Sequence, residues 1–276
     1  MASLTGLLRM ILGSAKVKER IIGVLGAFLD DSGTHSASRV VAIGGLLGTD
    51  VQWDAFAPAW DALLANPLPG KPPLKKGFHL TQCRSGNGEF RDYSRAERDH
   101  VTYLFRRIIL DIGLVSVAAA VNKVAWDKLV AGPVADELGS PLKLCFFKCL
   151  ELVINFCRRD KPGQKVCLCF DEGTRPELGD FAEFCNSHPD KYPELEMIFF
   201  APVSKIVALQ GGDMIALETY QYGEQWFEHG KDSIVNPHFR DFIARELSCG
   251  LAFDHDQISE MVDRARTAMI SRGLSV

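Results

Sequence analysis

The sequence contains no apolar run long enough to cross a bilayer. Its longest apolar stretches, such as 113–121 and 166–170, are far shorter than the roughly 20 residues that a membrane-spanning helix needs. Stretches of this length are typical of buried strands. In the first twenty residues an apolar segment precedes Lys16 and Lys18, which reverses the charge order of a secretory signal. We therefore expect no membrane association and a peripheral helix at 1–20.

A surplus of positive charge is also missing. The chain has 31 Lys and Arg against 35 Asp and Glu, so its net charge at pH 7 is -4. Proteins that bind DNA regardless of sequence usually carry a basic surplus, because phosphate neutralisation supplies much of their affinity. The negative charge of an acidic catalytic site would be offset by the divalent cations that the site binds. The charge balance therefore disfavours a pure binding protein more than it disfavours an enzyme.

Cysteine motifs for metal binding are absent, although the chain has eight cysteines. No CxxC pair occurs, and no Cys/His cluster has zinc-finger spacing. Cys145, Cys149 and Cys157 recur at helical spacing, whereas Cys167 and Cys169 alternate as in a strand. We expect reduced cysteines that serve as small core residues, which points to the cytoplasm.

No repeat, low-complexity tract or linker divides the 276 residues, so we predict one domain. Hydrophobic residues make up 47% and charged residues 24%, as in ordinary globular proteins. We expect the core at about 22–225 and added C-terminal helices within 237–272.

Two apolar runs, at 23–30 and 39–47, are joined by a Ser/Gly/Thr-rich connection, which predicts an antiparallel hairpin. A capping box of Ser94 and Glu97 marks a helix start, and the Gly-rich stretch 77–93 is expected to be a functional loop. Further strands are expected at 114–121, 165–171 and 197–201. Further helices are expected at 53–64, 94–110, 141–159, 209–226, 237–247 and 256–270.

This order of elements predicts an α/β fold with a mixed sheet flanked by helices. Ligands in such sheets bind at the carboxyl ends of strands. Asp30 and Asp31 end the first expected strand, and Asp171 and Glu172 end the fourth. Because neighbouring strand residues point to opposite faces, one acid of each pair can face a common pocket.

A third acid, Asp213, follows two glycines in LQGGDMIALETYQY. The glycines allow close backbone approach, and we expect Asp213 in the first turn of a helix, where the dipole favours a carboxylate. Each acid taken singly is ordinary turn or cap chemistry. Three converging carboxylates need a cation, and hard oxygen ligands favour Mg²⁺ or Mn²⁺. Two such ions can activate water and stabilise the leaving oxygen of a phosphodiester.

Four motifs together resemble the family labelled domain of unknown function 3800. FLDDSG at 28–33 resembles its strand-end DESG, and LQGGDMIA at 209–216 resembles its late LQxADxxA helix start. FHLT at 78–81 is similar to its Leu-His segment, and CFDEG at 169–173 to its fourth-strand acid. The resemblance spans about 23–222. Asp31 stands where the family usually has Glu, and Gly212 where it commonly has Ala.

That family is grouped with the ribonuclease H-like fold, so the resemblance implies a metal-dependent nuclease. It implies Asp30, Asp171 and Asp213 as catalytic metal ligands. Glu172 is a candidate to assist or replace Asp171 at the metal. His79, in the Gly-rich stretch, is a candidate to orient the leaving group or relay a proton; packing as a loop histidine is the alternative.

Three functions follow as hypotheses. The first is a two-metal nuclease that hydrolyses phosphodiester bonds in DNA or RNA. The second is a non-catalytic nucleic-acid-binding or accessory module that retains the fold. The third is a metal-dependent hydrolase of a small phosphorylated substrate. The sequence leaves the choice of DNA or RNA and the oligomeric state open.

Overall fold

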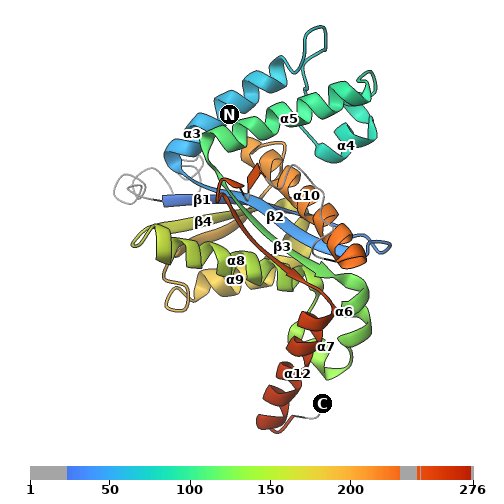
Figure 1. The fold of residues 1–276 in the computed structure, drawn as a ribbon. Helices are drawn as coiled ribbons and strands as arrows, with labels where there is room; N and C mark the ends of the chain where they lie inside the picture. The colour runs from blue at the N-terminus through green and yellow to red at the C-terminus, as the bar shows by residue number, and fades with distance from the viewer. Residues whose placement is uncertain (1–23, 231–240, 243, 275–276) are drawn as a thin grey trace.

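A mixed six-stranded sheet forms the centre of the molecule (Figure 1). The computed structural model describes residues 24–230, 241–242 and 244–274. The strand order is β5-β4-β1-β2-β3-β6, and β2 alone runs antiparallel to its neighbours among the described strands. The strands are β1 (Val24–Ser32), β2 (Val40–Thr49), β3 (Val115–Asn122), β4 (Lys165–Asp171), β5 (Leu195–Ala201) and β6 (Ser248–Phe253). The expected α/β class and mixed sheet are confirmed.

The predicted hairpin is the pair β1 and β2, whose register joins Leu29 to Gly45 and Asp30 to Gly44. β4 then lies parallel to β1 on the other side, with Leu29 beside Phe170. This arrangement brings the carboxyl ends of β1 and β4 next to each other. Both of these strands end in acidic residues.

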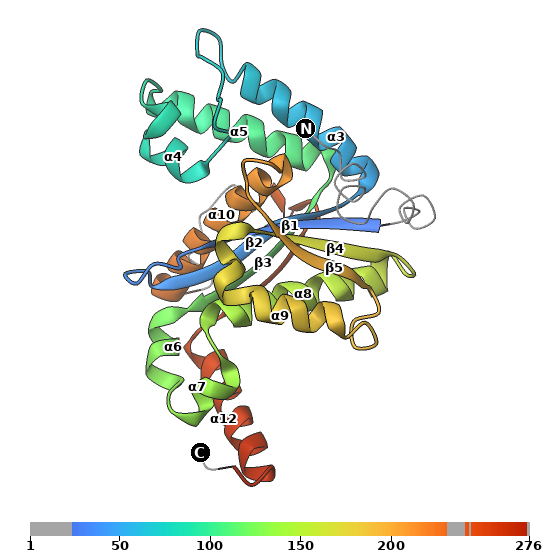
Figure 2. The same cartoon turned by 180° about the vertical axis from the view of Figure 1, so that it is seen from behind.

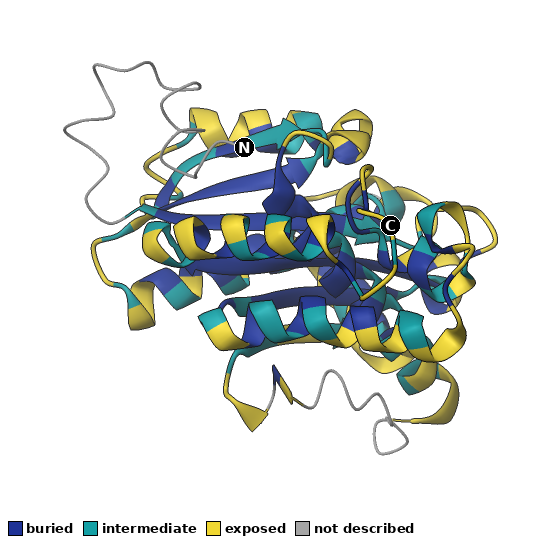
Figure 3. Cartoon of the chain, turned by 90° about the horizontal axis from the view of Figure 1, so that it is seen from above, coloured by how far each residue is buried: buried dark blue, intermediate teal, exposed yellow. Residues whose placement is uncertain are grey.

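Helices cover the two faces of the sheet in different numbers of layers (Figures 1 and 2). One face packs against α8 (Pro141–Asp160) and α9 (Arg175–Ser187). The other face packs against α10 (Val207–His229), which contacts β1, β2 and β3. α3 (Asp50–Ala65) contacts β1 and β2 beside α10, and an outer layer consists of α3, α4 (Leu80–Ser85) and α5 (Arg95–Ile112). The central strands are accordingly buried, and the outer helix faces are exposed (Figure 3).

Glycine in β2 lets α10 lie directly on the strand. A Cβ atom at Gly44 would stand 2.5 Å from the backbone N of Ala216 and 2.6 Å from its Cα. Because backbone atoms rather than a flexible side chain occupy that space, no larger residue fits without moving the helix. The sequence feature that fixes the position of α10 is therefore a small residue in the second strand.

The helices of the outer layer are stabilised by capping boxes and by side-chain hydrogen bonds between α3 and α5. Ser94 and Glu97 form the predicted capping box at the start of α5, and Thr49 and Gln52 form another at the start of α3. The Gln52 side chain also donates hydrogen bonds to the carbonyl oxygens of Ile112 and Gly113 at the end of α5. The start of α3 and the end of α5 are thereby joined.

Three helices project from one end of the sheet: α6 (Lys123–Leu129), α7 (Pro133–Leu138) and α12 (His255–Ser271). Their apolar side chains join the same core cluster as α8 and α9. Among the described residues no helix has both the length and the apolar character needed to span a membrane. All eight cysteines are free, and seven are buried, as predicted.

Several elements differ from the sequence prediction. The expected loop at 77–93 contains α4 and a 3-10 turn, η1 (Gly88–Phe90). The sequence pattern did not predict β6, α6, α7 or α9. β6 reads SCGLAF, too short and too poorly alternating to identify without its parallel partner β3. Of the helix expected at 237–247, residues 237–240 and 243 lie outside the described residues, and 241, 242 and 244 are helical. The helix expected at 1–20 lies wholly outside the described residues.

Candidate functional site

Strand alternation places Asp30 on the face of the sheet that α10 covers. Leu25, Ala27 and Leu29 lie in the core cluster beneath α8, whereas Phe28 lies in the cluster shared with α3 and α10. Because side chains alternate along a strand, Asp30 follows Phe28 toward α10. The Asp30 side chain is 9% exposed.

The same alternation applies to β4. Val166, Leu168 and Phe170 face α8, whereas Cys167 and Cys169 belong to the α10 cluster. Asp171 therefore points to the same face as Asp30. Its two carboxylate oxygens accept hydrogen bonds from the backbone N–H groups of Gly173, at 2.9 Å, and Val203, at 3.2 Å.

Asp213 reaches this region from α10. A Cβ atom at Gly212 would stand 3.1 Å from the carbonyl oxygen of Phe28, so the helix lies against the end of β1 just before Asp213. The Oδ2 atom of Asp213 accepts a hydrogen bond from the backbone N–H of Leu80 at 3.1 Å. Strands β1 and β4 and helix α10 thus direct three carboxylates toward one region.

The electrostatics show that these carboxylates interact. Burial raises the pKa of Asp30 well above its usual range, and the negative charges of Asp213 and Asp171 raise it further. Burial also raises the pKa of Asp213. The hydrogen bond from the Leu80 N–H and the charge of His79 lower this pKa, and the charge of Asp171 raises it. Deprotonation of Asp30 is therefore opposed by desolvation and by repulsion together.

His79 lies beside Asp213 because a buried glutamine holds the preceding segment. The Oε1 atom of Gln210 accepts hydrogen bonds from Phe78 N at 2.8 Å and from Trp60 Nε1 at 3.0 Å. Gly77 has φ +90°, and a Cβ there would stand 2.6 Å from Gln210 Nε2. Gln210 therefore fixes the chain that leads into α4, and His79 is the half-buried residue before that helix.

Of the other two acids at these strand ends, Glu172 lies apart from this group, whereas the charge of Asp31 acts on Asp30 and Asp213. Glu172 is the exposed first residue of the 3-10 turn η2 (Glu172–Thr174), and no hydrogen bond joins it to the three aspartates. The Asp31 carboxylate accepts a hydrogen bond from Thr34 Oγ1 at 2.8 Å, and its pKa is raised by burial. The structure therefore brings Asp30, Asp171, Asp213 and His79 together and leaves Glu172 outside.

The expected place of Asp213 in its helix was wrong. We expected the first turn, but α10 begins at Val207, six residues earlier. The apolar run VALQGG continues the helix toward its N-terminus, so Asp213 receives no stabilisation from unpaired N–H groups at the helix start. The Leu80 N–H, which belongs to another helix, lowers its pKa instead.

The donor set fits a hard divalent cation in its chemistry. The three acids offer only carboxylate oxygens, which Mg²⁺ and Mn²⁺ prefer. In their present positions, however, no three His, Cys, Asp or Glu side chains in the described part of the chain are grouped closely enough to hold a metal ion. Both oxygens of Asp171 already accept backbone hydrogen bonds. Asp30 and Asp213 would therefore supply the more open oxygens.

A small cavity lies elsewhere along α10. It has a volume of about 170 Å³ and is lined in part by Val40, Asn122, Glu224 and His255. These residues are near the C-terminal half of the helix, two or more turns beyond Asp213. The candidate site is therefore defined by its acids rather than by an enclosed cavity.

Three groups at the site were not identified from the sequence. Gln210 stands in an apolar helical run, and a lone glutamine in such a run is a signal that could have been used. The N–H groups of Leu80 and Val203 belong to the backbone, so no residue type marks them. Their roles depend on the packing of segments distant in sequence.

Comparisons with known proteins give little further guidance. No family model matches the chain, and no curated protein matches it. Among solved structures, the chain is similar to one described as "Structure of the PCNA:RNase HII complex from Archaeoglobus fulgidus". The sequence identity is 13% and the TM-score is 0.36, over 80% of this chain and 90% of that chain. A likeness this distant assigns no function to the chain.

Proposed function

We propose that this protein is a metal-dependent nuclease with a ribonuclease H-like arrangement, related to the domain of unknown function 3800 family. The observation that carries the proposal is the buried Asp30, whose pKa is raised by burial and by the charges of Asp213 and Asp171. A site that concentrates negative charge in this way is suited to a bound cation. The motifs that resemble the family contain the same three acids.

In this proposal, Asp30, Asp171 and Asp213 hold Mg²⁺ or Mn²⁺. Bound cations would supply the charge that activates a water molecule and stabilises the leaving oxygen of a phosphodiester. The water would lose a proton to solvent as its oxygen bonds to phosphorus, and the bond from phosphorus to the leaving oxygen would break. His79, beside Asp213, would give a proton to that leaving oxygen.

Hydrolysis of labelled single-stranded, duplex and hybrid nucleic acids tests the proposal. We expect cleavage that requires Mg²⁺ or Mn²⁺ and is lost in the Asp30→Asn variant. Glu172→Gln is the matched control, because Glu172 lies outside the group of acids, and it should cleave at close to the wild-type rate. Equal cleavage by wild type and Asp30→Asn would refute the assignment.

One observation favours a second candidate, an accessory module that binds nucleic acid without cutting it. Both carboxylate oxygens of Asp171 accept backbone hydrogen bonds, which leaves this acid with fewer free lone pairs for an ion. This candidate predicts nucleic-acid binding with no cleavage under any metal condition. The same substrates therefore separate the two functions.

A further inference from the structure

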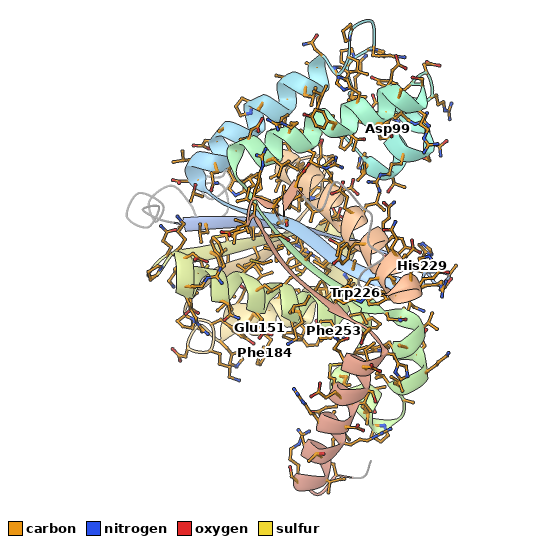
Figure 4. All side chains as sticks on the ribbon, in the orientation of Figure 1. Asp99, Glu151, Phe184, Trp226, His229 and Phe253 are labelled. Carbon is orange, nitrogen blue, oxygen red and sulfur yellow. The ribbon has the colours of Figure 1, made fainter. Side chains whose placement is uncertain are left out.

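Positive charge is concentrated in one segment of this acidic chain. Residues 71–107 contain nine lysines and arginines against four aspartates and glutamates, whereas the whole chain has net charge -4. The segment comprises the approach to α4, α4 itself, η1 and most of α5. It lies in the outer layer beyond α10, where Figure 4 labels Asp99. A surplus so localised creates a positive surface beside the acidic site.

Several of these cations are open to solvent. Lys75, Lys76, Arg91 and Arg95 are exposed, and none of them forms an ion pair with another described residue. The backbone N–H groups of Lys75 and Lys76 donate hydrogen bonds to the carboxylate of Glu89. Because Glu89 stands two residues before Arg91, this contact holds Arg91 and the two lysines in one neighbourhood.

The segment leads directly into the acidic site. Three residues separate Lys76 from Leu80, whose N–H donates a hydrogen bond to Asp213. The intervening chain is fixed by Gln210 through Phe78. The two lysines are consequently tied to the acids by a short, anchored connection rather than by a free loop.

Arg84 stands at the inner edge of this surface, held against α10. Its guanidinium donates a hydrogen bond to the side chain of Gln221 and lies 3.6 Å from Glu218. Glu218 is fully buried and pairs at closer range with Arg106. Arg84 therefore shares its carboxylate partner, and its side chain remains 29% exposed. A fixed, partly exposed guanidinium matches the geometry of a phosphate.

The spacing between Arg84 and the acids suits a nucleic-acid strand. The two α10 partners of Arg84, Glu218 and Gln221, lie five and eight residues beyond Asp213, which is about 7.5 to 12 Å along the helix at 1.5 Å per residue. A strand that advances about 3.4 Å per nucleotide covers this distance in roughly two to four nucleotides.

We propose that Arg84 and the basic surface of residues 71–107 bind the phosphates of a nucleic-acid strand several nucleotides long, which extends from the acidic site across α4. The inference rests on the proposed function for its choice of substrate and narrows it to a polymer. It distinguishes a nuclease from a hydrolase of small phosphorylated compounds. Phosphate contacts position the strand and carry no sequence preference.

Strand binding without cleavage is the direct test. Labelled DNA and RNA single strands of about 16 nucleotides are titrated with the full chain in EDTA, by fluorescence anisotropy, at several salt concentrations. The test variants are the double change Lys75→Gln/Lys76→Gln and the single change Arg84→Gln. The control is Lys161→Gln/Lys191→Gln, which removes the same charge near the amino ends of β4 and β5.

We expect the lysine double variant to bind the strand about threefold to tenfold more weakly than wild type does. The slope of the logarithm of the binding constant against the logarithm of salt concentration should fall by roughly one for each lost phosphate contact. The control should bind as wild type does. Thermal melting shows whether Arg84→Gln remains folded, and the lysine variant decides the question if it does not. The inference is overturned if the wild-type protein does not bind the strand, or if the lysine double variant binds it as tightly as wild type does. It is also overturned if a mononucleotide binds as tightly as the strand.

The outcome of the strand-binding experiment can be distinguished from the outcome of the cleavage experiment. If the strand binds through these cations and no metal produces cleavage, the surface is correct and the nuclease assignment is wrong. If cleavage depends on Asp30 while the lysine and arginine variants bind as wild type does, the nuclease assignment stands and the surface is wrong.

Discussion

The two faces of the sheet are built from different kinds of residue. Toward α8 and α9, the fully buried side chains of β1 and β4 are apolar, among them Leu25, Leu29 and Phe170, and Asp31 at the end of β1 is partly exposed. Toward α10, the same strands present Phe28 and Cys169 and then end in Asp30 and Asp171. One face therefore contributes burial of apolar surface, and the other combines burial with charge.

The helices on these faces differ in the same way. Charged residues of α8 such as Glu151, labelled in Figure 4, point to solvent. On α10, Gln210, Asp213 and Glu218 all lie against other elements and bond to them. Burying such groups costs free energy unless each has a partner. These polar side chains of α10 therefore depend on partners from other elements, whereas exposed charged residues of α8 such as Glu151 do not.

The largest effect is expected from removing a buried charge on the α10 side. Glu218→Ala would leave the guanidinium of Arg106, which is 1% exposed, without this carboxylate. We expect a loss of about 3–5 kcal/mol in unfolding free energy. Urea denaturation measures it.

The matched change on the opposite face is Glu151→Ala. Glu151 forms an exposed pair with Lys148 at 2.8 Å, and such pairs contribute about 0–1 kcal/mol. Similar losses for Glu151→Ala and Glu218→Ala would contradict the contrast between the two faces.

The next effect concerns the close contact of α10 with the sheet. Gly44→Ala places a Cβ 2.5 Å from the backbone of Ala216, so the helix has to shift. We expect a loss of about 1–3 kcal/mol, with lower activity in any assay that depends on Asp213. The control is Gly250→Ala in β6, where the nearest atom lies at an ordinary 3.7 Å. An equal loss of unfolding free energy for Gly250→Ala would show that replacing any strand glycine costs this much. It would contradict a specific role for the contact between Gly44 and α10.

A smaller effect of opposite sign is expected at Asp30. Burial and neighbouring charge raise the pKa of Asp30 in the folded protein, so its ionised form destabilises the fold. Without divalent metal, Asp30→Asn should therefore be more stable than wild type at neutral pH, by about 0.5–2 kcal/mol. Guanidinium unfolding in EDTA measures the difference.

The pH dependence of this difference follows from the sign of the shift. An unfolded Asp titrates near pH 3.9, and the folded Asp30 titrates higher. The advantage of the Asn variant should be absent below about pH 4, grow as the pH rises to the folded pKa, and then remain constant. Asp190→Asn, at an exposed position, should show no such dependence. A less stable Asp30→Asn at neutral pH would contradict the electrostatic account.

The smallest effect is on thiol chemistry and involves no change in stability. Burial raises the pKa of Cys157 to about 11 and that of Cys167 to about 12, so few thiolates exist at neutral pH. A thiol reagent should label native protein mainly at Cys249, the one cysteine that is not fully buried. Rapid labelling of Cys149 under native conditions would show that the α8 face opens readily.

The sequence predicted the elements whose patterns are local. The hairpin of β1 and β2, the capping box at Ser94 and the bounds of β4 agree with the structure because alternation, caps and breakers are read from adjacent residues. β6 was missed because its residues stay partly exposed and it forms a strand by pairing with β3, more than 100 residues away in sequence. The loop expected around α4 proved helical because packing on α5 and α10 stabilises a short helix that has no side-chain cap.

For the candidate site too, the sequence predicted the features that follow from local patterns and missed those that depend on distant contacts. Strand ends located Asp30 and Asp171, since alternation assigns them a face once the strand is known. The place of Asp213 within its helix was wrong, because an apolar run gives no sign of where a buried helix begins. The roles of Gln210 and of the Leu80 N–H depend on contacts between distant segments, which no local pattern encodes.

The most direct test of the central claim is a titration of Mn²⁺ into metal-free protein, with thermal stability and calorimetric heat measured for wild type and Asp30→Asn. The account predicts that wild type binds the ion and gains stability, by about 2.7 kcal/mol when the free ion is 100 times its Kd. It also predicts that Asp30→Asn, the more stable protein without metal, gains almost nothing. Equal gains in both proteins, or none in wild type, would contradict a cation site formed by Asp30, Asp171 and Asp213.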